Sequence, residues 1–248
     1  MYQLGGITKL GFREKMKSTL NKIVRKVRKI RIVRKIAPFA FISPQGERGI
    51  TKKGHRGYVG GLWEEMGDLQ FNFLLSMGLK PNMYLLDIAC GSLRLGVKAI
   101  PYLECSHYLG IEKWSALVKE GLEKELDPKI RVEKQPNIII SDSFEFNKLG
   151  QRADFAIAQS LFTHLPPSLI NSCFRKLNPW LKEDGKFYAT FFEAKQKINT
   201  PTKPHDHASY GYTQAEMRAF GETNGFNYNY IGNWNHPRNQ VIVEYRKS

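Results

Sequence analysis

The order of apolar and polar residues predicts a layered α/β fold for most of the chain. Short apolar runs bounded by turn-forming residues predict buried strands at 83–88, 107–112, 138–141, 154–159 and 186–192. Apolar residues spaced three and four apart predict helices at 63–77, 93–102, 115–125, 167–181 and 213–223. Strands separated by helices form βαβ units, so we expect a doubly wound, mostly parallel sheet with helices on both faces. Two further runs, 226–231 and 241–245, are spaced like a closing hairpin and bring the sheet to seven strands.

The first 44 residues follow a different pattern. Residues 12–30 place their apolar side chains on one stripe of a helix, and lysine and arginine cover most of the remainder. A basic amphipathic helix of this kind binds anionic membrane surfaces, here through residues 12–36. Its cations also suit nucleic acid phosphates, and a third interpretation is that the stripe packs on the body. We therefore divide the chain into a basic amphipathic N-terminal arm, 1–44, and a domain, 45–248, with a turn-rich linker predicted at 44–49.

Charge and composition narrow the class of protein. The 248 residues include 38 lysines and arginines against 23 aspartates and glutamates, and residues 1–40 hold 12 of the basic residues with one acid. In the rest of the chain the numbers of basic and acidic residues are therefore nearly equal. Its 42% hydrophobic and 25% charged residues are typical of a globular protein rather than a collagen-like, disordered or polytopic membrane protein. Three cysteines without paired spacing predict a reducing compartment, so we expect a cytoplasmic protein, peripheral at the inner membrane face if the arm binds there.

The most informative segment is a small-residue turn after the first predicted strand, LLDIACGSLRLG at 85–96. In a doubly wound sheet such a turn holds a nucleotide-like ligand. The following helix, expected to begin at Ser92 or just after it, presents free N–H groups to an anion. A dinucleotide site needs a second glycine where this chain has Leu93, whose side chain would obstruct a pyrophosphate. S-adenosylmethionine (SAM) has no phosphate and offers a carboxylate, so the turn favours SAM.

Polar residues end the next three strands at the same edge of the predicted sheet. Glu112 follows the second strand and suits the two hydroxyls of an adenosine ribose, although a solvated loop acid is the alternative. Asp142 follows the third strand and can accept a hydrogen bond from an adenine amino group, with Phe144 beside the ring. Gln159 and Ser160 end the fourth strand. The ordered set indicates an adenosine-containing cofactor.

With these motifs the sequence resembles the class I SAM-dependent methyltransferases over roughly residues 55–248. The resemblance rests on DIACGS, YLGIEKW, SDSFEF, AIAQSLFTHL and LKEDGKFYATFFE. The chain is similar in particular to bacterial small-molecule and glycan methyltransferases, through HRGYVGGLWEEMG and GNWNHPRNQ. It departs from many members at Ala89 and Leu93, where they carry glycine. The resemblance implies a Rossmann-like fold and transfer of a methyl group from SAM to a small-molecule, saccharide or lipid-linked acceptor, at oxygen.

The resemblance also implies which residues hold the cofactor. The turn lines the methionine end of SAM, the end of the second strand the ribose, and the end of the third strand the adenine, while the fourth strand ends near the transferred methyl group. In that order these residues are Asp87, Ala89, Gly91 and Ser92; Glu112 and Lys113; Asp142 and Ser143; and Gln159. For Arg94 two interpretations stay open: it pairs with the methionine carboxylate, or it is solvated.

Methyl transfer to a hydroxyl group calls for a base near the cofactor. His164 follows the fourth strand and is the first candidate, because a histidine pKa suits work near neutrality. The alternative is that His164 caps the next helix or fixes the loop. A second cluster, His205, Asp206 and His207, supplies an acid or base through Asp206 and His207, or is a polar connector. Too few further ligands accompany this cluster for a metal, and none is predicted.

Two segments are expected to cover the site: 56–61, whose glycines suit a lid over SAM, and 236–238, whose Arg238 suits a carboxylate or phosphate. Two other functions stay open. One is an RNA methyltransferase that grips phosphates with the arm. The nearly balanced body and the lack of an Asn/Asp-Pro-Pro-Tyr/Phe segment after the fourth strand disfavour it. The other is a non-catalytic protein of this fold that acts as a binding partner.

Overall fold

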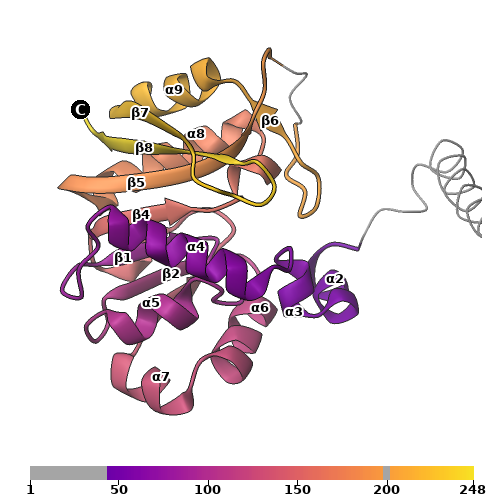
Figure 1. Cartoon of the computed structure of the whole chain (residues 1–248), viewed down its shortest axis with the longest axis vertical. Helices are drawn as coiled ribbons and strands as arrows, with labels where there is room; N and C mark the ends of the chain where they lie inside the picture. Colours follow the sequence, from indigo (N-terminus) through magenta and orange to yellow (C-terminus); the bar gives the residue numbers. More distant parts are fainter. Residues whose placement is uncertain (1–43, 198–201) are drawn as a thin grey trace, which may run out of the picture. The chain divides into compact units, whose positions relative to one another are not determined.

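A computed structural model describes residues 44–197 and 202–248, which fold around a central sheet (Figure 1). The described strands are β1 (Leu85–Ile88), β2 (Tyr108–Glu112), β3 (Asn137–Ile140), β4 (Ala153–Ala158), β5 (Leu181–Glu193), β6 (Gly211–Tyr212), β7 (Phe226–Asn233) and β8 (Val241–Lys247). Their order in the sheet is β3-β2-β1-β4-β5-β8-β7, with the two-residue β6 beside the end of β5. Strands β1 to β6 are parallel to their neighbours in this group, and β8 and β7 close the sheet in the antiparallel sense.

Helices cover both faces of this sheet (Figure 1). On one face lie α4 (Trp63–Ser76) and α5 (Gly96–Tyr102), and on the other α8 (Pro167–Leu177) and α9 (Gln214–Glu222). Strand β1 contributes to both cores, because Leu85 packs with α4 and α5 whereas Leu86 and Ile88 pack with α8 and α9. A strand buried on both faces needs a continuous apolar run instead of an alternating one. The shorter elements are α2 (Gly46–Lys53), α3 (His55–Tyr58), α6 (Ser115–Glu120), α7 (Pro128–Lys134), the π-helical turn η1 (Gly121–Glu125) and the 3-10 turns η2 (Phe146–Leu149), η3 (Phe162–His164) and η4 (Asn178–Trp180).

The predicted fold class is confirmed. The doubly wound, mostly parallel sheet is present, and the seven predicted strands are all found, with the short β6 as an eighth. Residues 45–248 form one compact unit. The predicted arm, apart from Pro44, lies outside the described residues, and so do its membrane and nucleic acid interpretations. Within 44–197 and 202–248, no helix has both the length and the apolar character needed to cross a bilayer.

Three local predictions are wrong. The helix expected at Ser92 begins at Gly96, because residues 91–95 form a tight turn instead. The helix expected to reach residue 181 ends at Leu177, since β5 already begins at Leu181 and pairs there with Ala153. The linker expected at 44–49 is mostly the first turn of α2. Helix α7 and strand β6 were not predicted.

Helix α2 begins at a glycine because of a tertiary contact. Gly46 has a φ of 62°, and a side chain on it would lie 2.8 Å from the indole ring of Trp114, just after β2. The Gly46 N–H donates to the hydroxyl of Tyr58 at 2.7 Å. We call residues 45–61, which hold α2, α3 and the following glycine turn, the cap. The cap lies beside the carboxyl ends of the parallel strands (Figure 1).

Gly121, at the start of η1, lies very close to the turn after β1. A Cβ atom on Gly121 would lie 2.5 Å from the carbonyl oxygen of Ser92, which is backbone and cannot move aside easily. We expect Gly121→Ala to lower the free energy of unfolding by about 1–3 kcal/mol, as overpacking does. Urea denaturation measures this loss. The control is Gly57→Ala, where the nearest atom would be 3.7 Å away, in ordinary contact; equal unfolding midpoints for the two variants would contradict the prediction.

Candidate functional site

The turn after β1 is held in an unusual backbone conformation. Ala89, Gly91 and Leu93 have φ values of 63°, 57° and 67°, in the left-handed region. Only one of the three is glycine, so two side-chain-bearing residues carry a cost of roughly 1 kcal/mol each. The N–H groups of Ala89 and Cys90 both donate to the carbonyl of Ile111, at 2.8 and 3.1 Å, which ties the turn to β2. The turn is therefore imposed by its neighbours and not only by glycine.

Leu93 does not obstruct the ligand side of the turn. Its side chain is fully buried in the core formed with α4 and α5. The left-handed backbone at Leu93 turns the side chain inward, where it contacts Gly96 and Gly121. The predicted clash with a pyrophosphate is thus wrong. The preference for SAM over a dinucleotide must rest on the other residues at this edge.

Glu112 is the electrostatic centre of the turn. Its side chain is buried, and its carboxylate accepts three backbone N–H groups, from Gly91 at 3.0 Å, Lys113 at 2.9 Å and Trp114 at 3.0 Å. Burial raises the pKa of Glu112, and these three hydrogen bonds oppose the rise. The interpretation of Glu112 as a solvated loop acid is wrong. Within the described part of the chain its Oε2 atom accepts one hydrogen bond, from the Gly91 N–H, so a lone pair is left for a ligand hydroxyl.

Asp87 lies beneath the turn. It is buried in β1 and accepts a hydrogen bond from the Tyr108 hydroxyl at 2.7 Å. Burial raises the pKa of Asp87 to about 7, although the tyrosine hydrogen bond and the charge of Arg94 lower it. Asp87 therefore titrates near neutral pH, and its hydrogen bond to Tyr108 joins β1 to β2 just before the turn.

Arg94 is partly buried, and its guanidinium is engaged by the protein. One Nη1 atom donates to the carbonyls of Val59 and Gly61, both at 3.0 Å, and Nη2 donates to Gln159 Oε1 at 2.8 Å. Burial lowers the pKa of Arg94 to about 10, so the guanidinium is still charged at pH 7. All three partners are neutral. The buried Nε–H has no hydrogen-bond partner in the described structure, which leaves a donor and a charge for an anion.

The predicted adenine residues follow β3, whose end lies beside Glu112. Asp142 and Ser143 are exposed just beyond β3. The Ser143 carbonyl accepts from Lys176 Nζ at 2.6 Å, which links the loop to α8. Ile140, at the end of β3, is 45% exposed and gives this rim an apolar surface. These residues occupy the edge of the sheet where the sequence predicted them, and their part in binding stays a prediction.

The cap covers the turn and is held at two points. A Cβ atom on Gly91 would lie 2.9 Å from a methyl group of Val59, so the cap and the turn are in direct contact. At one end Glu125 accepts from His55 Nε2 at 2.5 Å and from Arg56 at 2.6 and 2.7 Å. At the other end Asp206 binds the cap. The lid predicted at 56–61 is thus part of a larger segment that includes α2.

Asp206 is a structural anchor, because its carboxylate is fully engaged. It accepts hydrogen bonds from the Tyr58 hydroxyl, the Gly46 N–H and Lys113 Nζ. Burial raises its pKa, but the hydrogen bonds from Lys113 and Tyr58 outweigh this and hold the pKa at about 2, below the ordinary 3.8. Its stabilising contribution is therefore present above about pH 4 and is lost as the pH falls towards 2. The geometry disfavours the predicted proton transfer by Asp206.

The neighbouring histidines differ in their surroundings. His205 accepts the backbone N–H groups of His207 and Ala208 through Nδ1, both at 3.0 Å. His207 contacts the Tyr58 ring edge-on at 4.9 Å and lies 3.4 Å from Lys53 Nζ. The loop 205–208 thus fastens to the cap on one side. Among the described residues, no three His, Cys, Asp or Glu side chains cluster closely enough to hold a metal ion.

His164 lies on the inner side of that loop. Its Nδ1 donates to the carbonyl of Ala208 at 2.5 Å, and its own carbonyl accepts the His205 N–H at 3.0 Å. Because a carbonyl only accepts, the Nδ1 atom carries the proton and Nε2 carries the lone pair. Burial lowers the pKa of His164 below 6.5, so the ring is neutral at pH 7. This is the form that a general base needs.

Several residues at the site were not singled out in the sequence. Tyr58 and Trp114 hold the cap, and both lie inside the motifs HRGYVGG and YLGIEKW, so the signal was present but no role could be assigned without the fold. Gln240 was not singled out either, and it is buried near the end of β4 beside His236, which belongs to the predicted covering segment 236–238. Gln240 Oε1 accepts from Ser160 Oγ at 3.0 Å and from Thr190 Oγ1 at 2.7 Å.

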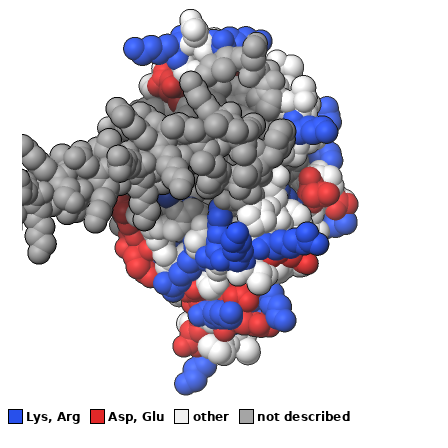
Figure 2. All heavy atoms as spheres, turned by 90° about the vertical axis from the view of Figure 1, so that its right-hand side faces the viewer, with Lys and Arg blue, Asp and Glu red and all other residues white. Residues whose placement is uncertain are grey.

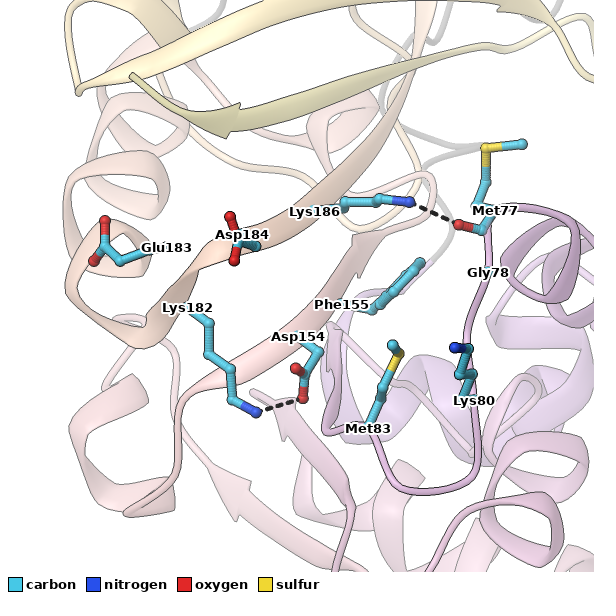
Figure 3. Close-up of a pocket in the computed structure, with 10 residues that line it drawn as sticks. All are labelled: Met77, Gly78, Lys80, Met83, Asp154, Phe155, Lys182, Glu183, Asp184 and Lys186. Carbon is cyan, nitrogen blue, oxygen red and sulfur yellow. Dashed lines mark hydrogen bonds and ion pairs between the residues drawn. The ribbon is translucent and has the colours of Figure 1, made fainter.

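A separate pocket of about 380 Å³ lies at the opposite edge of the sheet, among the starts of β4 and β5 and the loop before β1 (Figure 3). Two of its three lysines are already engaged: Lys182 pairs with Asp154 at 2.8 Å, and Lys186 donates to the Met77 carbonyl at 2.7 Å. Ligands of doubly wound folds bind at the carboxyl ends of the strands. This pocket therefore does not belong to the candidate site.

Comparisons with solved structures support the doubly wound α/β fold described above. No family model matches the chain. The structure is similar to magnesium protoporphyrin IX methyltransferase from Synechocystis PCC 6803, solved with bound SAM, at a TM-score of 0.57 and 17% identity, covering 89% of this chain and 96% of that one. It is also similar to the glycopeptide N-methyltransferase MtfA, solved with SAM (TM-score 0.56, 12% identity, 73% and 94% covered). A third is the TehB-like SAM-dependent methyltransferase from Corynebacterium glutamicum (0.56, 13%, 82% and 97%).

The chain has the fold of SAM-dependent methyltransferases. At these identities the likeness establishes the fold and leaves cofactor and chemistry to the residues of the site.

We expect Asp206→Asn to loosen the cap without unfolding the domain. Loss of a charged acceptor for three donors removes at least ~1.5 kcal/mol, so amide hydrogens of residues 46–58 should exchange about tenfold faster. Hydrogen exchange read by mass spectrometry measures this. The control is Asp184→Asn, an exposed aspartate at the opposite edge. Unchanged exchange in the cap of Asp206→Asn would show that the carboxylate does not hold it.

Proposed function

We propose that this protein is a SAM-dependent methyltransferase that acts on a small-molecule, saccharide or lipid-linked acceptor, at oxygen. The observation that carries the proposal is the presence of Glu112 and Arg94 at the same turn. Glu112 presents a carboxylate lone pair suited to a ribose hydroxyl, and Arg94 presents a buried, unpartnered Nε–H and a positive charge suited to a carboxylate. SAM carries both of those groups.

The polar atoms of the site fit this cofactor. Ser92 Oγ, Arg94 Nε and Trp114 Nε1 are buried without a hydrogen-bond partner in the part of the chain that the structure describes. Buried polar atoms are normally paired, so such a group of three near one turn favours a bound polar ligand. We assign Arg94 to the methionine carboxylate, Glu112 to the ribose, and the rim at Asp142 and Ser143 to the adenine. When bound, SAM supplies an electrophilic methyl group.

The protein's own contribution is to orient the acceptor and remove its proton. Correct placement of two reactants can account for about 7–11 kcal/mol of a barrier, and the cap is positioned to enclose them. We propose His164 Nε2 as the base, because the Nδ1–H bond to Ala208 fixes the tautomer and burial keeps the ring neutral. Asp206 then has a positioning role, since residues 205–208 join the cap to His164.

RNA is a less suitable acceptor for the described domain. On the face shown in Figure 2, basic and acidic side chains are interspersed over the described surface. A nucleic acid interface instead concentrates basic residues on one face. The arm's contact with a membrane or with RNA, and the location at a membrane surface, stay predictions for residues 1–44.

The cofactor is tested by thermal unfolding of the full chain with S-adenosylhomocysteine (SAH), SAM and NAD in parallel. A ligand at ~100 times its dissociation constant adds ~2.7 kcal/mol, which raises the midpoint by about 5–10 °C at this size. We expect the shift with SAH and SAM and none with NAD. A shift with NAD alone would make the site a dinucleotide site, and no shift with any of them would favour a non-catalytic protein.

The role of Arg94 is tested by comparing SAH with 5′-methylthioadenosine, which lacks the carboxylate. We expect Arg94→Gln to weaken SAH binding by about tenfold or more, because a charge-assisted hydrogen bond to a carboxylate is lost. Calorimetry should show methylthioadenosine binding unchanged in the variant. Lys98→Gln, on α5 and paired with Asp68 and Glu64, is the matched control. Equal losses for both ligands in Arg94→Gln would place Arg94 in the fold and not at the carboxylate.

A further inference from the structure

The loop between β7 and β8 brings an excess of hydrogen-bond donors to the end of β4. His236 is buried and stands between two N–H donors: the backbone N–H of Arg238 at 3.1 Å from Nδ1, and the side-chain amide of Gln159 at 3.3 Å from Nε2. A neutral imidazole has one lone pair and one N–H. It can therefore accept from one of these neighbours only, and the other contact joins two donors.

The side-chain amide of Gln159 has a fixed orientation, so the two donors cannot be relieved by turning it round. Its Oε1 atom accepts from Arg94, so the amide nitrogen must face Ser160 and His236. With Nδ1 accepting the backbone N–H of Arg238, His236 Nε2 carries the proton and points at the Gln159 amide. Burial and the charges of Arg238 and Arg94 lower the pKa of His236 to about 4, so the ring is neutral at pH 7. An acceptor atom is what this pair lacks.

Arg238 adds a cation on the same side. Its guanidinium donates to the carbonyl of Gly60 in the cap, and the residue is exposed. No ion pair joins Arg238 to a carboxylate among the described residues, whose ion pairs involve other cations. A guanidinium has five N–H donors and favours the flat oxygens of carboxylate or phosphate. Arg238, His236 and Gln159 together therefore present donors and positive charge without an acceptor.

Two of these donors, His236 and Arg238, lie on the other side of the sheet's crossover point from the cofactor residues, and Gln159 stands between the two groups. The turn residues, Glu112 and the rim at Asp142 follow β1, β2 and β3, on one side of the crossover point between β1 and β4. His236 and Arg238 follow β7, and Gln240 and Thr190, which hold Ser160, belong to the β8 and β5 side. Ligands of doubly wound sheets bind where the strand order reverses, which is between β1 and β4 here.

We propose that the methyl acceptor carries an anionic group, a carboxylate or a phosphate, and that Arg238, His236 Nε2–H and the Gln159 amide bind it. This inference rests on the proposed function and names the class of its acceptor. The methionine carboxylate of the cofactor is also an anion that these donors could bind, but we have assigned it to Arg94. The two possibilities are distinguished by whether an anion still binds when the cofactor product SAH is in place.

The experiment is a titration of the full chain with inorganic phosphate at constant ionic strength, with and without saturating SAH. NMR of ¹³C-labelled histidine observes the ring, and His236→Gln identifies its resonance among the six histidines. We expect phosphate to shift the His236 resonance saturably in the SAH complex and to raise its pKa by about one unit, as a nearby opposite charge does. Arg238→Gln should abolish the saturable shift. Arg218→Gln, an exposed arginine on α9 that pairs with Glu222, should leave it unchanged.

Three outcomes overturn the proposal: phosphate that is displaced by SAH, which returns the subsite to the cofactor carboxylate; no saturable shift; or a shift that survives Arg238→Gln. The proposed cofactor has its own readout in these samples. If SAH fails to bind, the proposed function fails and the anion is no longer assigned to an acceptor. The phosphate titration of the free protein still decides whether Arg238 and His236 form an anion site.

Discussion

The carboxylate of Glu112 organises the edge of the sheet on which the site is built. It stands at the end of β2 and draws the N–H groups of Gly91, Lys113 and Trp114 around one buried negative charge. A buried carboxylate is costly unless hydrogen bonds surround it, so the turn after β1 and the loop after β2 must both close onto it. This is the same requirement that keeps Ala89 and Leu93 in a left-handed backbone that glycine would adopt more easily.

The cap depends on Glu112 indirectly, through the two residues that follow it. With its N–H bound to Glu112, Trp114 presents its ring to Gly46, and Lys113 reaches Asp206. Asp206 then accepts from Tyr58 and fastens residues 205–208, on whose inner side His164 donates to Ala208. A chain of contacts thus runs from Glu112 through the cap to His164. The placement of the cap and the orientation of His164 are consequently linked in this structure.

Charge is distributed unevenly across the site. On the side of β1 to β3 the buried charges are acidic, Asp87 and Glu112, and they are held by backbone N–H groups and a tyrosine. On the side of β4 and the β7–β8 loop the charge is basic: Arg238 belongs to that loop, and Arg94, which follows β1, donates to Gln159 at the end of β4. Such an arrangement suits a ligand pair in which hydroxyls meet the acidic side and anionic groups meet the basic side. Gln159 stands between the two and orients its amide by its bond to Arg94.

The sequence by itself determined the fold class, because apolar runs and helical spacing report local burial, and a strand such as 155–158 is apolar whatever its neighbours are. It also determined that Glu112, Asp142 and Gln159 share one edge, since parallel strands all end on the same side. Only the tertiary structure decided what these residues do locally. Leu93 was expected to face the ligand and turns into the core, and Arg94 was left open and is partly buried. Asp206 was left open between an acid or base and a polar connector, and the structure shows it bound to the cap. Each outcome depends on partners far away in the chain, and hydrogen bonds between distant segments leave no periodic trace in the order of residues.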